Sequence, residues 1–356
     1  MNPDPTLLNV LDYEAKAAET MDRPWHAYYA GGVCDDRTLR DNRDAFARLR
    51  LRPRMLRDVS RISTEVTIAG SSHPLPFLIA PTAMHKLAHP DGELATARAA
   101  RAHGVTHVLS SISTTAVEDV VGIGHDVWFQ LYVLKDRAWS ERIVRRVETA
   151  GAQALVWTVD LPVSGLRENL VRAEFSTPPE LPFPNLTEPG APPVHDLLAT
   201  LGVHFDPGLT WKDLDWLRSI TDLPIWVKGL LRDDDARRAV DAGATGVIVS
   251  NHGGRQLDTA VAALDALPEI VAAVGDRTTV LMDGGVRRGT DVLKALALGA
   301  RAVLLGRAVL WGLAVDGEAG ATHVLQILRD ELTNVMAQCG CPDIASIGPD
   351  LIFRGR

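Results

Sequence analysis

The sequence predicts an α/β protein folded as a (β/α)8 TIM barrel. Eight short apolar runs alternate with amphipathic stretches, and such alternation over 356 residues favours a closed parallel barrel. Several amphipathic stretches end on glycine after an alanine-rich turn, as at Gly104, Gly243 and Gly299, which is typical of a helix C-terminus. The alternative, an open doubly wound sheet, normally carries a Gly-x-Gly-x-x-Gly loop after its first strand, and the sequence has no such motif.

The expected elements form one domain over residues 1–356. Residues 1–70 are charged and are expected to be an N-terminal helical segment with a turn at Gly31-Gly32. The periodic stretches at 92–104, 136–150, 233–243 and 289–299 are predicted helices. The eight predicted strands lie at 77–80, 107–110, 128–132, 155–159, 225–228, 247–250, 280–283 and 302–305.

One connection departs from this alternation. Residues 175–209, after the fourth predicted strand, are rich in proline and have few periodic apolar positions. A connection this long in a compact domain is commonly a lid or a binding loop. Because it follows a barrel strand, it would lie at the face where barrel enzymes carry their active sites. We therefore expect a mobile active-site lid at 175–209.

The composition is that of an ordinary globular protein, with 46% hydrophobic and 23% charged residues. The net charge of −8 argues against a nucleic-acid partner, because phosphate backbones need a basic surface. No stretch approaches the roughly 18 consecutive apolar residues of a membrane helix, and the N-terminus does not read as a signal peptide. The three cysteines are expected to be reduced thiols, which favours a cytoplasmic protein.

The most informative stretch is the heptapeptide Ser-Asn-His-Gly-Gly-Arg-Gln at residues 250–256. It follows the apolar run 246–249, so a predicted strand delivers His252 and Arg255 to its carboxyl end on a glycine-rich turn. Histidine can accept a proton near neutral pH. Arginine can bind a carboxylate through two parallel hydrogen bonds. The pair predicts a site that binds a carboxylate and moves a proton.

Chemically useful residues follow the other predicted strands as well, at the ends where barrel enzymes carry function. These are Pro81-Thr82-Ala83, Ser110-Ser111, Gln130 and Tyr132, Thr158 and Asp160, Lys228, Asp283-Gly284-Gly285 with Arg287, and Gly306-Arg307.

The last two strand ends predict a phosphate site. The run Asp-Gly-Gly-Val-Arg-Arg-Gly at 283–289 opens a predicted helix, and Gly306-Arg307 opens another after the eighth strand. Glycine lets backbone N–H groups approach an anion, and a helix N-terminus favours negative charge. Phosphate sites after strands seven and eight are common in this fold. We therefore expect a phosphorylated ligand.

Lys228 ends an apolar strand, so its ammonium group must face a polar site or a partner. It could form a Schiff base or stabilise an anionic cofactor ring, and the sequence does not separate the two. No cluster of His, Cys, Asp and Glu has the spacing of a metal site. Four histidines lie close in the sequence but on different predicted elements, and we expect them to be structural or solvated, with no shared face: His85, His89, His103 and His107.

These motifs resemble those of the FMN-dependent α-hydroxy-acid oxidases and dehydrogenases, the family of glycolate, lactate and hydroxymandelate oxidases and of mandelate dehydrogenase. The resemblance runs from Tyr-Tyr-Ala-Gly-Gly at 28–32 to Gly-Cys at 340–341. Besides the heptapeptide, it rests on Ala-Pro-Thr-Ala-Met at 80–84, Ala-His-Pro-Asp-Gly-Glu at 88–93, Gln-Leu-Tyr at 130–132, Thr-Val-Asp at 158–160, Val-Lys-Gly at 227–229 and Asp-Gly-Gly-Val-Arg at 283–287.

The resemblance implies FMN as the cofactor and a role for each matching residue. His252 would be the catalytic base, and Asp160 would orient its imidazole and favour the charged form. Lys228 would face the N1–C2=O edge of the flavin and stabilise the reduced ring. Arg255 and Arg167 would bind the substrate carboxylate. Tyr28 and Tyr132 would hydrogen-bond the substrate carboxylate or hydroxyl. The implied cofactor-binding positions are Pro81, Thr82, Ala83, Ser110, Gln130, Thr158, Lys228, Ser250, Asp283, Gly284, Gly285, Arg287, Gly306 and Arg307.

Several positions depart from the family's pattern. Ile112 stands where glycolate oxidase has tryptophan, and Leu166 stands where a basic residue is common, so both favour a bulkier and less polar substrate. His85 replaces a glutamine and Ala308 replaces a proline, and neither is expected to alter the chemistry. Ala83 is common among the oxidases, whereas some dehydrogenases have glycine there, which favours O2 as the electron acceptor.

We therefore expect oxidation of an (S)-2-hydroxy acid with a bulky or aromatic side chain, mandelate-like, to the 2-keto acid, with O2 reduced to H2O2. A soluble dehydrogenase with another electron acceptor is the alternative. A second alternative is a non-oxidase FMN barrel such as a type 2 isopentenyl-diphosphate isomerase, which has no need of the pair His252 and Arg255. An inactive binding protein is least favoured. The resemblance also implies a homotetramer. The sequence at 175–209 has no membrane segment, so we do not expect a membrane-bound form.

Overall fold

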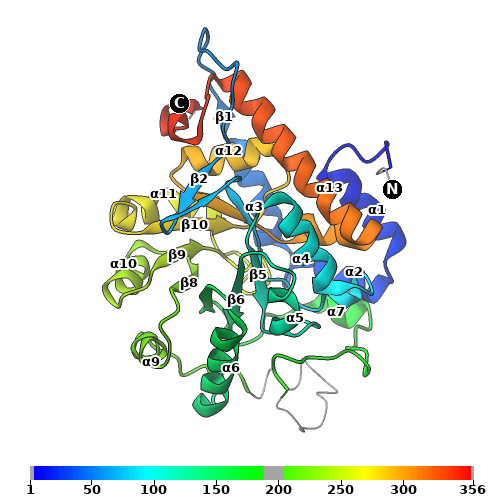
Figure 1. Cartoon of the computed structure of the whole chain (residues 1–356). Coiled ribbons are helices and arrows are strands. Elements are labelled where there is room, and N and C mark those ends of the chain that lie inside the picture. Colours follow the sequence, from blue (N-terminus) through cyan, green and yellow to red (C-terminus); the bar gives the residue numbers. More distant parts are fainter. Residues whose placement is uncertain (1–3, 188–203, 354–356) are drawn as a thin grey trace.

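A closed barrel of eight parallel strands forms the centre of the protein (Figure 1). The computed structural model describes residues 4–187 and 204–353. The barrel order is β4-β5-β6-β7-β8-β9-β10-β11, which confirms the predicted fold class. Each predicted strand matches an observed one to within two residues at either end. The strands are β4 Phe77–Ile79, β5 His107–Ser110, β6 Val127–Leu131, β7 Ala154–Thr158, β8 Ile225–Leu230, β9 Gly246–Val249, β10 Thr279–Asp283 and β11 Ala302–Leu305.

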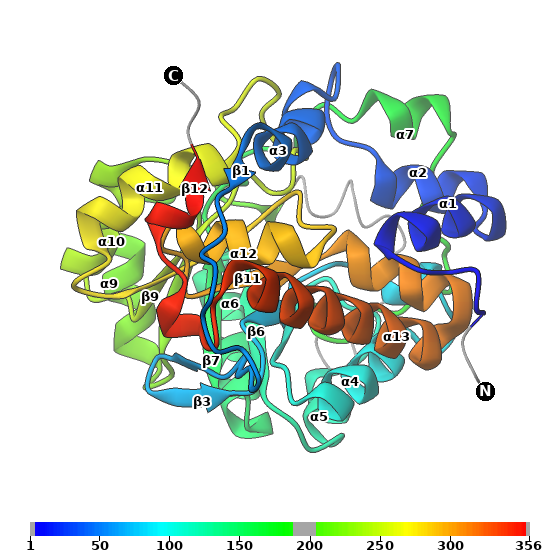
Figure 2. The ribbon, with the colours of Figure 1, turned by 90° about the horizontal axis from the view of Figure 1, so that it is seen from above.

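Helices surround the barrel (Figure 2). The four predicted helices are confirmed. The helix before Gly104 ends directly before that glycine, and the helices before Gly243 and Gly299 end two residues before theirs. Gly104 adopts a left-handed backbone with φ of 63° and caps the preceding helix through its N–H group. The helices after β4 are α4 Gly92–His103, α5 Val117–Val121, α6 Arg137–Ala150, α7 Glu168–Arg172, α9 Lys212–Ile220, α10 Asp233–Asp241, α11 Ala263–Val274, α12 Gly289–Ala297 and α13 Arg307–Cys339.

The strands are buried on both faces, as expected for a parallel barrel wrapped by helices. One face of each strand packs against the helices, and the other fills the barrel interior. Trp226 is fully buried in that interior, and its ring stacks on Trp128 with 4.8 Å between ring centres. The neighbouring position 246 is occupied by glycine, because a Cβ atom there would come within 2.1 Å of the Trp226 ring.

The N-terminal region is only partly helical, which corrects the expectation for 1–70. Three helices, α1 Val10–Thr20, α2 Arg23–Ala30 and α3 Arg37–Arg48, form as expected. Beyond them the chain is extended: β1 Arg50–Leu51 pairs with β12 Ile352–Phe353, and β2 Val66–Ile68 forms a hairpin with β3 Ser71–His73. The alternating apolar residues of β2 explain the difference, since they pack against the inward-facing side chains of the barrel.

Residues 188–203 of the predicted lid at 175–209 lie outside the described residues. Its described ends, including Phe175 and Phe205, reach the cavity considered below. In the described ranges, no helix combines the length and apolar character needed to cross a membrane. The thiols of Cys34, Cys339 and Cys341 are all free.

The stacked tryptophans make a prediction about stability. Trp226→Ala removes one of the two stacked tryptophans of the barrel interior and leaves a cavity, so it should lower the free energy of unfolding by about 3–5 kcal/mol. Trp139 is partly exposed on α6 and is a matched control, with an expected loss of about 1 kcal/mol. Urea denaturation followed by tryptophan fluorescence measures both. Equal losses for the two variants would show that the stacked pair contributes no more to the free energy of unfolding than a partly exposed tryptophan does.

Candidate active site

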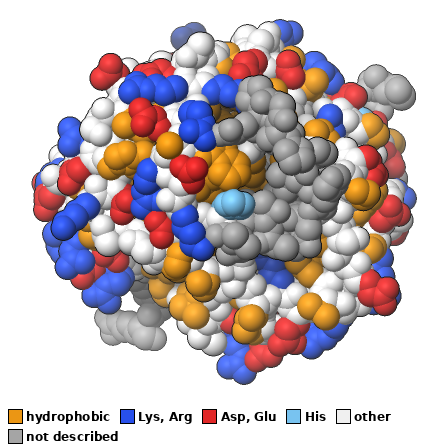
Figure 3. Space-filling model, turned by 90° about the horizontal axis from the view of Figure 1, so that it is seen from below, with side chains coloured by type: hydrophobic (Ala, Val, Ile, Leu, Met, Phe, Trp, Pro, Cys, Tyr) orange, Lys and Arg blue, Asp and Glu red, His pale blue; other side chains and the backbone are white. Residues whose placement is uncertain are grey.

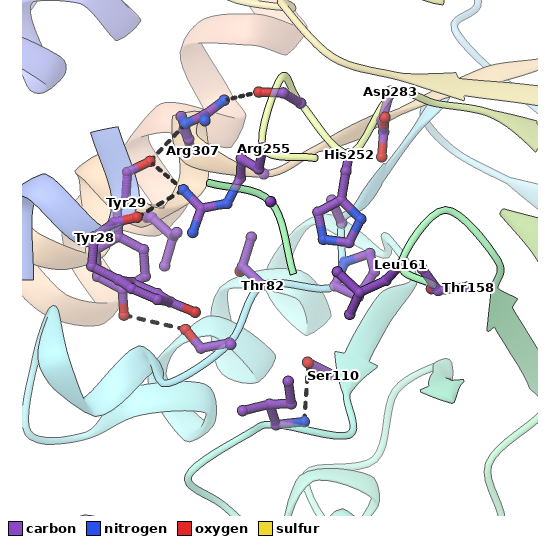
Figure 4. A pocket seen from close by; sticks show the side chains of 18 of the residues that line it. Tyr28, Tyr29, Thr82, Ser110, Thr158, Leu161, His252, Arg255, Asp283 and Arg307 are labelled. Carbon is purple, nitrogen blue, oxygen red and sulfur yellow. Dashed lines mark hydrogen bonds between the residues drawn. The ribbon is translucent and has the colours of Figure 1, made fainter. Parts of the chain in front are cut away.

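A cavity of about 680 Å³ opens at the carboxyl ends of the barrel strands. It is lined by every site residue that the sequence predicted except Asp160 and Ser250. Those two lie directly behind it, where they contact His252 and Lys228. Figure 4 shows His252, Arg255, Arg307 and Thr82 around this shared space, although they come from the ends of three different strands, β9, β11 and β4.

The side chain of His252 is fixed by Asp160. Its Nδ1 atom lies 2.7 Å from Oδ1 of Asp160, so the ring donates Nδ1–H to the carboxylate and leaves Nε2 free. The Nε2 atom lies 3.5 Å from the Tyr132 hydroxyl, on the cavity side. His252 has a left-handed backbone with φ of 59°. Gly229 leaves room for Asp160, because a Cβ atom at position 229 would lie only 2.6 Å from the Cβ atom of Asp160.

Burial and charge set the protonation states of this pair. Burial lowers the pKa of His252 below its usual value, although Asp160 opposes the shift. Burial alone would raise the pKa of Asp160, but the charges of His252 and Lys228 outweigh it and hold that pKa below its ordinary value. The site therefore holds a neutral imidazole against an ionised carboxylate near pH 7, which is the state a general base needs.

Two guanidinium groups lie in the cavity near His252. Nη1 of Arg255 donates to the backbone carbonyls of Tyr28, at 2.7 Å, and of Gly31, at 3.0 Å. The guanidinium groups of Arg255 and Arg167 lie 5.0 and 5.9 Å from the centre of the Tyr28 ring. Burial, with the nearby charge of Arg167, lowers the pKa of Arg255 to about 10. In the described ranges, neither arginine forms an ion pair with a carboxylate.

A second group of cations lies where the sequence predicted a phosphate. Arg307 donates to the carbonyls of Tyr29, at 2.8 Å, and Gly253, at 3.0 Å. Burial lowers its pKa well below the usual value, and neighbouring arginines add to the shift. Arg287 has one partly exposed counterion, Glu14, at 3.3 Å. Gly285 precedes it with φ of 83°, and a Cβ atom there would lie 2.1 Å from a backbone oxygen of α3. Positive charge therefore exceeds negative charge here, as an anion site requires.

Lys228 is buried and fully partnered. Its Nζ atom lies 3.0 Å from Asp283 Oδ2 and 2.8 Å from Ser250 Oγ. Burial alone would lower the pKa of Lys228, but Asp283 and Asp160 outweigh it and raise the pKa. The amine therefore stays protonated. Because a protonated amine is not a nucleophile, this geometry favours electrostatic stabilisation over the Schiff base that the sequence left open.

The cavity wall carries buried polar atoms that lack a protein partner. They include Gln130 Nε2, Thr158 Oγ1 and Asp283 Oδ1. Buried polar groups in proteins nearly always form hydrogen bonds, so these atoms indicate a polar ligand. Together with the arginines at the ends of β10 and β11, they fit a flat heterocycle that carries donors, acceptors and a phosphate. The residues present therefore fit FMN.

An apolar part of the cavity was not predicted from the sequence. It is formed by Leu161, Leu170, Phe175 and Phe205, together with the predicted Ile112. Phe175 stacks on Tyr28 with 5.0 Å between ring centres, and the Phe205 ring lies 4.9 Å from that of Tyr132. Most of these residues come from irregular connections without a motif. Figure 3 shows the protein from below, where hydrophobic side chains gather beside the grey residues and are flanked by Lys and Arg.

Tyr29 was also missed, although it lies within the predicted motif 28–32. Its hydroxyl donates to the backbone carbonyl of Met84 at 2.5 Å, which ties α2 to the loop after β4. Met84 has a left-handed backbone with φ of 58°. The contact holds the loop that carries Thr82 and Ala83 against the cavity.

The expectation that the four neighbouring histidines share no face is wrong in part. The buried rings of His85 and His107 are nearly parallel, with 6.1 Å between ring centres, and His125 continues the row 6.2 Å beyond His107. His103 instead contacts the carbonyl of Thr322 on α13. Within the described part of the chain, no group of three or more His, Cys, Asp and Glu side chains could hold a metal ion.

Comparison with known proteins decides the family. The model of the FMN-dependent dehydrogenase family matches residues 17–354. The chain belongs to this family. Its cofactor is FMN, and its reaction is the FMN-dependent oxidation of a 2-hydroxy acid. The isomerase and inactive-protein alternatives are thereby set aside.

The relatives cover nearly the whole chain. It is 50% identical over 351 residues to an L-lactate oxidase from Nostoc sp., with 96% of each chain covered. It is 48% identical over 347 residues to glycolate oxidase 1 from Oryza sativa subsp. indica, which covers 96% of this chain and 94% of the relative. A soluble mutant of the membrane-associated (S)-mandelate dehydrogenase from Pseudomonas putida has a TM-score of 0.93 at 41% identity, covering 98% of this chain and 100% of the other.

The contact between His252 and Asp160 makes a prediction about proton binding. Burial lowers the pKa of His252, whereas the negative charge of Asp160 raises that pKa. Asp160→Asn removes this charge and should therefore lower the pKa of His252 further. At pH 6.5 most of the wild-type imidazole is neutral, and the variant should be more so. Histidine-selective isotope labelling and an NMR pH titration measure the shift. A higher pKa in the variant would contradict this electrostatic account.

Proposed function

We propose that the enzyme oxidises (S)-2-hydroxy acids with an apolar side chain, that His252 is the catalytic base and that O2 is the electron acceptor. One observation carries the proposal: the Nε2 atom of His252 faces a cavity that also holds the guanidinium groups of Arg255 and Arg167, which have no carboxylate partner among the described residues. A 2-hydroxy acid brings the carboxylate that the arginines lack and the hydroxyl proton that the imidazole can accept.

Arg255 and Arg167 would bind the carboxylate, and Tyr28 would support both. The backbone carbonyls that hold Nη1 of Arg255 leave the rest of its guanidinium group for the ligand. A buried guanidinium favours an anion strongly, because little water competes for it. Docking the carboxylate here would place the hydroxyl group near His252 Nε2 and Tyr132. Such positioning can remove several kcal/mol of barrier, on the order of 7–11 kcal/mol in the best intramolecular cases.

FMN, when bound, accepts the two electrons and the α-hydrogen. His252 would take the hydroxyl proton at Nε2 and become an imidazolium. Asp160, ionised beside Nδ1, would stabilise that positive charge. Lys228 would hold a positive charge at the cofactor site through its pairing with Asp283. These residues together supply a base, its counterion and a fixed cation.

The substrate side chain should be apolar and of substantial size, with mandelate the first expectation. Ile112, Leu161, Leu170, Phe175 and Phe205 offer an apolar wall on the cavity side. Mandelate oxidase with a phenylpropionic acid ligand has a TM-score of 0.89 to this chain at 42% identity. The 50% identity to an L-lactate oxidase favours lactate as the second candidate.

O2 is proposed as the acceptor on two grounds. Ala83 lines the cavity beside the cofactor positions, where the resemblance links alanine to oxidases. The relatives from Nostoc and Oryza are both oxidases by name. A dehydrogenase with another acceptor is the competing proposal, and oxygen uptake separates the two. We further propose a cytoplasmic homotetramer, which rests on the free thiols and on the family resemblance.

Removal of the base is the first test. His252→Ala should keep FMN, because its side chain forms no part of the phosphate site, and should slow flavin reduction by roughly 10²–10⁴-fold. Anaerobic stopped-flow mixing with (S)-mandelate measures the rate from the loss of flavin absorbance. A rate within threefold of the wild type would rule out His252 as the base.

A change in pocket size tests the substrate class. Ile112→Trp fills the apolar wall, so kcat/KM for mandelate should fall by tenfold or more while that for lactate or glycolate changes little. Ile112→Val is the matched control and should keep mandelate turnover. Oxygen uptake with each acid is the measurement. If Ile112→Trp lowers kcat/KM equally for all three acids, Ile112 does not set the specificity.

The same assay tests the electron acceptor. If none of the three acids causes oxygen uptake although the flavin is reduced, the acceptor is not O2.

A further inference from the structure

A chain of side chains runs from α4 to the cavity wall through His85, a residue that the reaction above does not use. His85 Nε2 lies 2.5 Å from the hydroxyl oxygen of Thr82, which lines the cavity beside Gly306. His85 Nδ1 lies 3.0 Å from the hydroxyl oxygen of Thr96 on α4. Both His85 and Thr96 are buried, whereas Thr82 is partly exposed to the cavity.

The position of His85 is tightly held. Its backbone N–H donates to Glu93 Oε1 at 3.1 Å. The fully buried Glu93 carboxylate also accepts hydrogen bonds from Thr114 and Thr115, at 2.6 to 2.8 Å, in the loop after β5. The nearly parallel ring of His107 covers one side of the His85 imidazole. The imidazole therefore has little freedom to turn away from Thr82.

The protonation state of His85 limits the direction of the hydrogen bonds between Thr96, His85 and Thr82. Burial lowers the pKa of His85, so the ring is neutral and has one N–H donor and one acceptor nitrogen. One threonine must then donate to the ring and the other must accept from it. If Thr96 donates to Nδ1, the Nε2–H group donates to Thr82, and the Thr82 hydroxyl proton is left for a ligand in the cavity. The reverse order leaves the cavity without that donor.

We propose that His85 is a positioning residue for the cofactor: by donating Nε2–H to Thr82, it directs the Thr82 hydroxyl proton at the FMN ring and stabilises the reduced, anionic flavin. The cavity already holds several cations and hydrogen-bond donors. This favours the arrangement in which the Thr82 hydroxyl donates into the cavity over the reverse arrangement, in which it donates to His85. The inference rests on FMN binding and not on the identity of the substrate or acceptor. It differs from the expectation in the sequence analysis that the histidine at this position leaves the chemistry unaltered.

The reduction potential of bound FMN tests the proposal. In the purified holoenzyme, His85→Leu removes the ordered donor and should make the flavin harder to reduce. The expected change in the equilibrium constant of reduction is about three- to tenfold, and tenfold corresponds to about 30 mV for a two-electron couple. Equilibration with a reference dye during anaerobic reduction measures it without turnover. His85→Gln keeps one donor and one acceptor and should restore most of the potential.

A second variant shows whether His85 acts through Thr82. Thr82→Val should lower the potential at least as much as His85→Leu, and adding His85→Leu to Thr82→Val should cause no further change. His103→Leu alters a partly buried histidine at the C-terminal end of α4, where it contacts the carbonyl of Thr322, and should leave the potential unchanged. An unchanged potential in Thr82→Val, or additive shifts in the double variant, would overturn the proposal. Thr82→Val alone decides it if His85→Leu does not fold.

Discussion

The hydrogen bond between His252 and Asp160 is the contact on which the site depends. It uses Nδ1 for the carboxylate, so Nε2 is the atom that faces the cavity. Several unusual backbone features serve this one contact. His252 is held at positive φ, and Gly229 leaves room for Asp160 where any side chain would collide with it. Strained or close-packed backbone of this kind concentrates at functional sites because the surrounding fold compensates for its cost.

The second constraint is an excess of buried positive charge. Arg255, Arg287 and Arg307 all have lowered pKa values because burial penalises their charged forms. Backbone carbonyls of α2 and of the turn after β9 hold Arg255 and Arg307 in place without neutralising them. Arg287 has the partly exposed Glu14 as a counterion. Such an arrangement is unfavourable until an anion arrives. A phosphate at one end of the cavity and a carboxylate at the other would supply the missing negative charge, which links cofactor and substrate binding to the same physical cause.

Much of the barrel and the polar part of the site could be predicted from the sequence. The strands are short apolar runs of regular spacing, and the residues at their carboxyl ends converge because a barrel brings those ends together. The heptapeptide at 250–256 was specific enough to place His252 and Arg255 on one turn that lines the cavity. Lys228 was correctly placed in a polar site, but only the contacts with Asp283 and Ser250 show that it stays protonated.

The missed parts depend on contacts between distant segments. Phe175 and Phe205 lie at opposite ends of an irregular connection, so no periodicity marks them as neighbours of Tyr28 and Tyr132. The extended part of the region predicted as helical, residues 50–70, is missed because its charged composition hides the alternating pattern of β2. His85 is an exception, because Thr82 lies only three residues away, but the sequence does not reveal in which direction the His85 ring turns.

The most direct test of the account is the structure of the FMN-loaded protein with a slowly reacting 2-hydroxy acid bound. We predict that the carboxylate lies on Arg255 and Arg167, and that the hydroxyl oxygen lies about 2.6–3.2 Å from Nε2 of His252. A carboxylate bound elsewhere, or an imidazole that presents Nδ1 to the ligand, would contradict the account.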